Sequence, residues 1–108
     1  MTIMIHLFYT GTDDAAQRFA EEMTTSGTVE AIRNTKGNLR YEYFQSIDDP
    51  HTILLVDSWE DQSALDAHHE SPLMQKIAQL RDKYDLHMRV ERLKTDDNPP
   101  NDEQYIRR

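Results

Sequence analysis

The chain has 108 residues, with 12 lysines and arginines against 20 aspartates and glutamates and a formal net charge of −8. This acidic balance argues against nucleic acid and against an anionic membrane surface as partners, because phosphate contacts need clustered Lys and Arg. The absence of cysteine excludes disulfides, thiolate catalysis and cysteine-based metal sites. No apolar run approaches the roughly 18 residues of a transmembrane helix, and no signal-peptide pattern opens the chain, so we expect a single cytoplasmic domain.

Residues 3–9, with the sequence IMIHLFY, predict a first strand. Its side chains divide between two faces, with Met4, His6 and Phe8 on one and Ile3, Ile5, Leu7 and Tyr9 on the other. Both faces are mostly apolar, so we expect this strand to lie at the centre of a sheet and to be covered on both sides. His6 is then a polar side chain on an apolar face, where it needs a hydrogen-bond partner or a ligand.

One helix and a β-hairpin are predicted in the next part of the chain. Apolar residues at helical spacing predict an amphipathic helix, namely Ala16, Phe19, Ala20 and Met23. A short helical piece follows over 29–33. Residues 39–45 alternate in polarity and predict a strand nearer the edge of the sheet. The turn-forming residues 48–51 connect it to an antiparallel third strand, whose apolar run covers 53–56.

The stretch from residue 57 to residue 73 contains the side chains best suited to catalysis or ligand binding. Trp59 follows the third strand, and Asp61 is suited to cap the next helix because its carboxylate can accept the free N–H groups of a first turn. Inside that helix, His68 lies on the face turned towards the strand. Pro72 interrupts the helix, which bends or restarts there and runs to about residue 83. An indole and an imidazole are therefore aimed at the interface between sheet and helix.

The last strand is predicted at 87–93, with Met88 and Val90 facing the core and His87, Arg89 and Glu91 on the other side. The chain thus divides into a folded domain over 1–93 and a polar tail over 94–108. Tyr105 and Ile106 are the large apolar side chains of the tail. We expect them to contact a folded surface, that of a partner protomer or a crystal neighbour rather than their own sheet, because burying them would offset part of the entropy lost on ordering.

The predicted order β-α-β-β-α-β is typical of an α+β, ferredoxin-like protomer, in which a four-stranded antiparallel sheet carries both helices on one face. This arrangement leaves the second apolar face in water, with Ile5, Leu7 and Leu55, or their neighbours, exposed. A second copy that uses the same surface is the simplest cover for such a face. We therefore expect a homodimer.

Two segments of the chain resemble the antibiotic biosynthesis monooxygenase family: GNLRYEYFQSIDD at 37–49 and VDSWEDQSALDAHHESPL at 56–73. The family pattern combines a glycine turn, a strand with a tyrosine, a strand that ends in tryptophan, and a helix with Ala-Leu-x-x-His-x-x-Ser-Pro. In this chain the matching positions are Gly37, Tyr41, Ser46, Asp48, Trp59, Ala64, Leu65, His68, Ser71 and Pro72. The resemblance covers about residues 2–93. It implies a dimer whose two sheets close an α+β barrel, with a pocket between helices and sheet in each protomer.

The resemblance implies more than one kind of chemistry. Members of the family oxidise quinols or polyphenols with molecular oxygen and without metal or flavin, whereas others degrade haem or isomerise a phosphorylated signalling sugar. The haem-degrading members carry an Asn on the first strand and a His late in the second helix. This chain has His6 on its first strand and no histidine between His69 and His87, which argues against haem. Many members also carry a histidine directly after Ser-Pro, where this chain has Leu73.

The candidate catalytic residues are His68 and His6, and the candidate substrate-binding residues are Trp59, Tyr9 and Tyr41. His68 can deprotonate a phenol because imidazole titrates near neutrality; the alternative is a partly buried histidine satisfied by a backbone carbonyl. Trp59 is either a core residue or a platform for a substrate ring. Adjacent His68 and His69 diverge by about 100° around a helix, so a metal site would instead need His6, His68 and His87 to converge.

The function that follows is a monooxygenase that uses neither cofactor nor metal and oxidises a small electron-rich aromatic, such as a hydroquinone. The substrate would supply the electrons, and the protein would supply a base and a dry pocket. The sequence leaves one alternative open. It is a dimeric α+β barrel without oxygenase activity, either a small-molecule-binding module or an isomerase of a phosphorylated signalling sugar.

Overall fold

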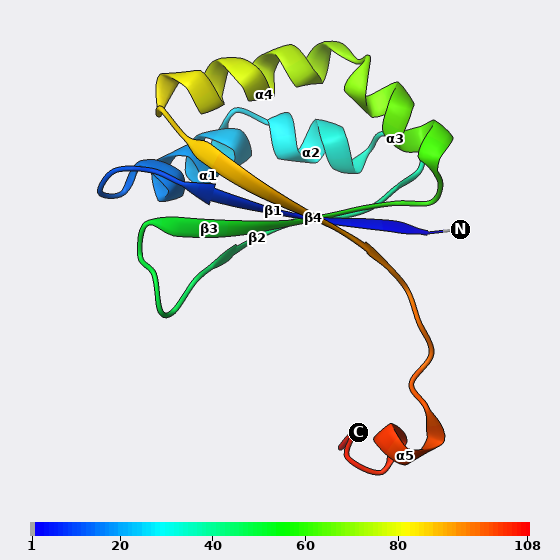
Figure 1. Cartoon of the computed structure of the whole chain (residues 1–108). Coiled ribbons are helices and arrows are strands. Elements are labelled where there is room, and N and C mark those ends of the chain that lie inside the picture. The colour runs from blue at the N-terminus through cyan, green and yellow to red at the C-terminus, as the bar shows by residue number, and fades with distance from the viewer. Residues whose placement is uncertain (1) are drawn as a thin grey trace.

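The computed structural model describes residues 2–108 (Figure 1). The elements follow one another as β1 (Ile3–Thr10), α1 (Ala15–Thr25), α2 (Thr28–Arg33), β2 (Asn38–Gln45), β3 (Thr52–Trp59), α3 (Gln62–His69), α4 (Pro72–Lys83), β4 (His87–Lys94) and α5 (Pro100–Glu103). The strands form one sheet in the order β2-β3-β1-β4, and every neighbouring pair is antiparallel. This confirms the α+β, ferredoxin-like prediction, with β1 central and β2 at an edge.

Helices α1 to α4 all lie on one side of the sheet (Figure 1). The face of β1 that meets them consists of Ile3, Ile5, Leu7 and Tyr9, and Ile3, Ile5 and Tyr9 are buried. On β3, Leu55 is buried on the same side at 1% exposure. Within one chain the helices cover one face of β1, and the cover expected from a second copy on its other face stays a prediction. Ile5 and Leu55 are therefore covered by the helices. The side chains without a helix layer are those of the residues next to them in sequence, which point to the other face.

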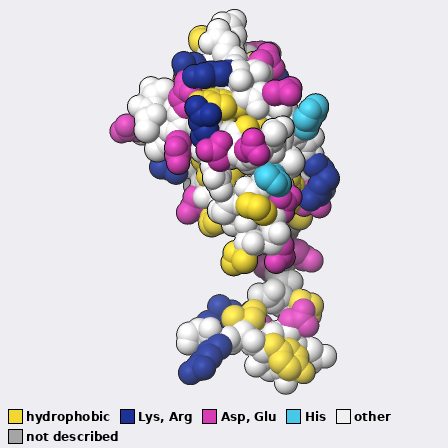
Figure 2. Space-filling model, turned by 90° about the vertical axis from the view of Figure 1, so that its left-hand side faces the viewer, with side chains coloured by type: hydrophobic (Ala, Val, Ile, Leu, Met, Phe, Trp, Pro, Cys, Tyr) yellow, Lys and Arg dark blue, Asp and Glu magenta, His cyan; other side chains and the backbone are white. Residues whose placement is uncertain are grey.

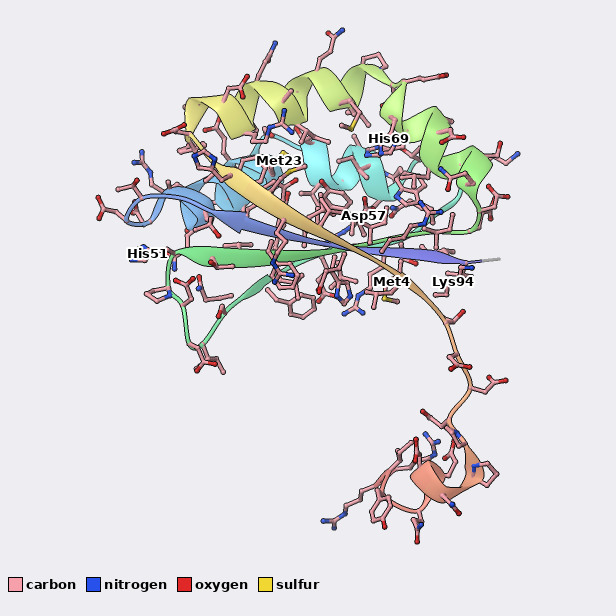
Figure 3. All side chains as sticks on the ribbon, viewed as in Figure 1. Met4, Met23, His51, Asp57, His69 and Lys94 are labelled. Carbon is pink, nitrogen blue, oxygen red and sulfur yellow. The ribbon has the colours of Figure 1, made fainter. Side chains whose placement is uncertain are left out.

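The open face of the sheet carries the alternate residues of all four strands. Cross-strand pairing sets Met4, His6 and Phe8 of β1 beside Leu54, Val56 and Ser58 of β3. Figure 3 shows Met4 below the sheet, whereas Met23 and Asp57 lie between the sheet and the helices. Among residues 2–108, no helix packs on this face, and α5 lies at a distance from it (Figure 1).

The edge strand β4 is less covered than the sequence suggested. Pairing with β1 places Met88 opposite Tyr9 and Val90 opposite Leu7, so both lie on the helix side, as predicted. They are nevertheless 44% and 50% exposed. They face the helix side but are not covered there, because the helix layer packs over β1, β2 and β3.

The sequence signals for the second helical segment are confirmed at its start and at its break. The Asp61 carboxylate accepts the Ala64 backbone N–H at 2.8 Å, which satisfies one of the free donors of the first turn. Pro72 opens α4, so the segment is two helices rather than one bent helix. Gly37 has a positive φ of 89°, and a Cβ there would lie 2.5 Å from the Cβ of Ala64. The glycine turn thus lets β2 begin directly against α3.

After β4 the chain leaves the sheet as an arm that ends in α5 (Figure 1). Figure 2 shows this arm as a separate lobe with hydrophobic side chains on its surface. Tyr105 is 82% exposed and Ile106 is 39% exposed. Their predicted contact with a partner protomer stays a prediction, as does the division of the chain at residue 93. In the described part of the chain, none of the helices has both the length and the apolar character needed to cross a membrane.

Candidate active site

The last three residues of β3 build the base of the site. Strand alternation directs Asp57 and Trp59 to the helix side together with Leu55. The Trp59 indole is completely buried, and its Nε1–H donates to the Asp57 carboxylate oxygen Oδ1 at 2.8 Å. Because an indole has a single polar atom, this bond holds the ring in one orientation.

His68 of α3 stacks on the face of the Trp59 indole, with 4.7 Å between the ring centroids and 29° between the ring planes. The sequence prediction that these two side chains meet between sheet and helix is confirmed. The imidazole is 3% exposed, and its Nδ1 is buried without a hydrogen-bond partner among residues 2–108. The alternative in which a carbonyl satisfies this nitrogen is therefore not what the structure shows.

Burial lowers the pKa of His68 from 6.5 to about 4, and the nearby positive charge of His69 adds a smaller decrease. The ring is consequently neutral at neutral pH, because burial disfavours the imidazolium. The neutral imidazole has a nitrogen lone pair free to accept a hydrogen bond or a proton from a ligand, and the lowered pKa makes it a weaker base than a solvated imidazole.

Asp57 is a buried carboxyl that the sequence analysis did not select. It is 7% exposed, and burial raises its pKa from 3.8 to about 7, against the lowering effect of the Trp59 hydrogen bond. The group therefore exchanges its proton in the neutral range. Its signal in the sequence was its position two residues before Trp59, which places both on one face if the strand continues past Val56.

Three tyrosines lie on the same helix-facing side of the sheet as this carboxyl. Tyr9 and Tyr41, both predicted substrate-binding residues, are 2% and 3% exposed, and Tyr43 completes the group. Burial raises the pKa of Tyr9 to about 12 and raises those of Tyr41 and Tyr43, and the Asp57 charge adds to all three shifts. The Tyr43 hydroxyl is buried. Sequence reasoning missed Tyr43, although it alternates with Tyr41.

His6 lies apart from this cluster. Its place in β1 directs it to the open face, between Val56 of β3 and Glu91 of β4. The sheet therefore separates the two candidate catalytic histidines. His87 lies exposed at the start of β4, so His6, His68 and His87 do not converge. Residues 2–108 contain no group of three or more His, Asp or Glu side chains arranged to hold a metal ion.

The side chains of Asp57, Trp59 and His68 are closed to solvent in this conformation. Five hollows with volumes of about 230–330 Å³ lie on the surface formed by residues 2–108, and none of these five is lined by Asp57, Trp59 or His68. Two of the hollows border residues that pair with Trp59: one is lined by Ile3, and another is lined by Asn38. A ligand that touches His68 must therefore displace side chains to enter.

The fold and the stacked Trp59–His68 pair agree with the family resemblance found in the sequence, and a direct comparison establishes it. The sequence model described as "Antibiotic biosynthesis monooxygenase" matches residues 2–80. The chain therefore belongs to the antibiotic biosynthesis monooxygenase family. Among curated proteins, no sequence matches this chain.

Several solved structures have the same fold. A conserved protein from Methanosarcina mazei superposes with a TM-score of 0.76 at 18% identity, covering 89% of this chain and 94% of that one. Rv0793 from Mycobacterium tuberculosis gives 0.75 at 19%, with 91% and 98% covered. SnoaB, a cofactor-independent oxygenase from Streptomyces nogalater, gives 0.74 at 13%, with 92% and 97% covered. At these identities the likeness shows the fold.

Proposed function

We propose that this protein is a cofactor-independent monooxygenase that oxidises a small electron-rich aromatic, a quinol or polyphenol, with molecular oxygen. The observation that carries the proposal is the neutral His68 imidazole, stacked on Trp59 with its buried Nδ1 unpartnered. An unpaired buried polar atom costs about 1–3 kcal/mol, and a ligand hydroxyl would remove that cost. Membership of a monooxygenase family and the fold shared with an oxygenase that needs no cofactor support the same reaction.

The reaction balances without a cofactor if the substrate supplies four electrons. His68 takes the proton of a ring hydroxyl, which leaves an electron-rich anion that reacts with dioxygen at a ring carbon. Cleavage of the O–O bond leaves one oxygen atom on the ring and releases the other as water. A hydroquinone thereby becomes a hydroxyquinone. Trp59 and the aromatic cluster around Tyr9 and Tyr41 keep water away from the anion and pack against the ring.

The test is oxygen uptake by metal-stripped protein across a panel of hydroquinones and polyphenols. We expect turnover of at least one compound and a large loss in His68→Ala, because a positioned base contributes about 10²–10⁴-fold. His69→Ala is the matched control, since His69 lies next along the same helix with an exposed side chain. Equal activity in His68→Ala and His69→Ala would contradict the role given to His68.

One observation favours a second function, that of a small-molecule-binding module without turnover. Asp57, Trp59 and His68 are closed off from the five hollows, so a ligand bound among them would be retained rather than exchanged. Native mass spectrometry of the purified protein separates the two functions. A retained aromatic supports the oxygenase, whereas a retained sugar phosphate would indicate the isomerase or binding function instead.

We also propose that the open face of the sheet joins two copies of the chain. Four strands of eight residues present about 500 Å² in projection, so two copies together offer about 1,000 Å², which is near the lower limit for a biological interface. The face combines apolar side chains on β1 and β3 with rim charges: Arg89 lies 4.0 Å from the centre of the Phe8 ring, and Arg40 lies 5.3 Å from that of Phe44.

A further inference from the structure

The hydrogen bond between Trp59 and Asp57 determines which way the indole faces. Both side chains are buried, and the donor and acceptor atoms are 2.8 Å apart. The two residues are separated by one position on β3. Their backbone atoms are also fixed, because Trp59 pairs with Ile3 and Asp57 pairs with Ile5 of β1. The ring therefore has little freedom to turn while the carboxylate accepts its N–H.

His68 depends on that indole for its own orientation. A functional imidazole is usually held by a hydrogen bond from the nitrogen that does not react. Here the buried Nδ1 has no hydrogen-bond partner among residues 2–108 and is the nitrogen left for the substrate, and the ring packs against Trp59 at 4.7 Å and against His69 at 5.9 Å between ring centroids. Whatever holds the indole thus also holds the imidazole.

We propose that Asp57 is a positioning residue of the active site: its carboxylate fixes the plane of Trp59, and Trp59 in turn holds His68 where it can accept the substrate proton. The catalytic part of this statement rests on the proposed function. The structural part, that Asp57 sets the Trp59–His68 stack, stands without it. If Asp57 served only as a hydrogen-bond acceptor for the buried indole, replacing Asp57 would leave His68 in its place.

The test follows the stack itself by NMR. The ring current of an indole moves the resonances of an imidazole lying on its face upfield, so His68 is recognisable among the five histidines of the chain. Its signal is assigned by its loss in His68→Gln. Asp57→Asn retains an oxygen that can accept the indole N–H, whereas Asp57→Leu has a similar size and no acceptor. We expect the upfield shift to persist in Asp57→Asn and to collapse in Asp57→Leu.

The controls distinguish misplacement from unfolding. His69→Gln should keep the His68 shift, and far-ultraviolet circular dichroism should show that each variant is folded. If Asp57→Leu does not fold, Asp57→Ser replaces it, since a serine hydroxyl is too short to reach the indole. A folded Asp57→Leu or Asp57→Ser that keeps the shift, or a folded Asp57→Asn that loses it, overturns the proposal.

Kinetics supply the second readout where the wild type turns over an aromatic substrate. Misplacing a base by about 1 Å can cost up to about 10²-fold, so Asp57→Leu should lower kcat about tenfold or more with KM little changed. Asp57→Asn should restore kcat. If the wild type shows no oxygenase activity, the proposed function fails while the NMR result still decides whether Asp57 positions His68. If the activity exists and kcat is lost equally in Asp57→Asn, the carboxylate acts by its charge and the positioning role is wrong.

Discussion

Replacing Asp57 and His68 one at a time should expose two opposite dependences of stability on pH that cancel in the wild type. Burial raises the pKa of Asp57 from 3.8 to about 7 and lowers the pKa of His68 from 6.5 to about 4. Neither shift is caused by the charge of the other group. Each group therefore contributes its own change in the free energy of unfolding.

The signs follow from proton binding in the folded and unfolded chains. Asp57 binds its proton more tightly in the folded chain, so its contribution is fully present below about pH 4 and is lost as the pH rises through 7. At about 1.4 kcal/mol per pKa unit, the loss is on the order of 4 kcal/mol. His68 binds its proton more weakly in the folded chain, so its contribution is present above pH 6.5 and is lost as the pH falls through 4, by about 3–4 kcal/mol.

The assay is urea unfolding at fixed protein concentration between pH 4 and pH 8. Asp57→Asn should become more stable as the pH rises from 4 to 6.5, because only the His68 effect remains. His68→Gln should become less stable as the pH rises from 4 to 7, because only the Asp57 effect remains. Exposed carboxylates contribute equally to the free energy of unfolding of the wild type and of both variants. Their contribution therefore cancels when each variant is compared with the wild type. A difference between Asp57→Asn and the wild type that does not vary with pH would refute the account of Asp57.

Three further predictions concern the core, the dimer and the tail. Trp59→Phe should lower the free energy of unfolding by about 1–3 kcal/mol, measured in urea, because Asp57 loses its hydrogen-bond donor; no change would contradict the importance of that bond. Leu54→Lys, on the open face, should give a monomer by analytical ultracentrifugation, whereas the matched control Ile47→Lys, in a hairpin turn at 98% exposure, should stay dimeric. Deleting residues 95–108 should leave the fold intact and weaken the dimer modestly; a truncated chain that does not fold, or that is wholly monomeric, would show that the tail is structural.

The sequence predicted the order of elements because each signal is local. Helical spacing, the Asp61 cap and the Pro72 break act within a few residues, and the structure has all of them. The meeting of His68 with Trp59 was predictable for the same reason. A strand that ends in tryptophan and a helix that starts three residues later bring those two side chains to one interface.

What the sequence did not reveal depends on pairing between distant strands. The apolar run ends at Val56, so Asp57 looked like the first residue after the strand. Pairing with Ile5 of β1 and Tyr41 of β2 instead extends β3 to Trp59 and turns the carboxyl into the core. Which of the two apolar faces of β1 the helices cover also depends on the whole sheet. That choice places Tyr9 in the cluster and His6 on the opposite side.

The central claim is that this fold oxidises an aromatic substrate with dioxygen and that His68 is the base. The most direct measurement is mass spectrometry of the product formed under ¹⁸O₂ by metal-stripped wild-type protein, His68→Ala and His69→Ala. We predict one ¹⁸O atom in the product and the other in water, with the reaction lost in His68→Ala and retained in His69→Ala. A product without ¹⁸O, or equal incorporation in all three proteins, would contradict the account.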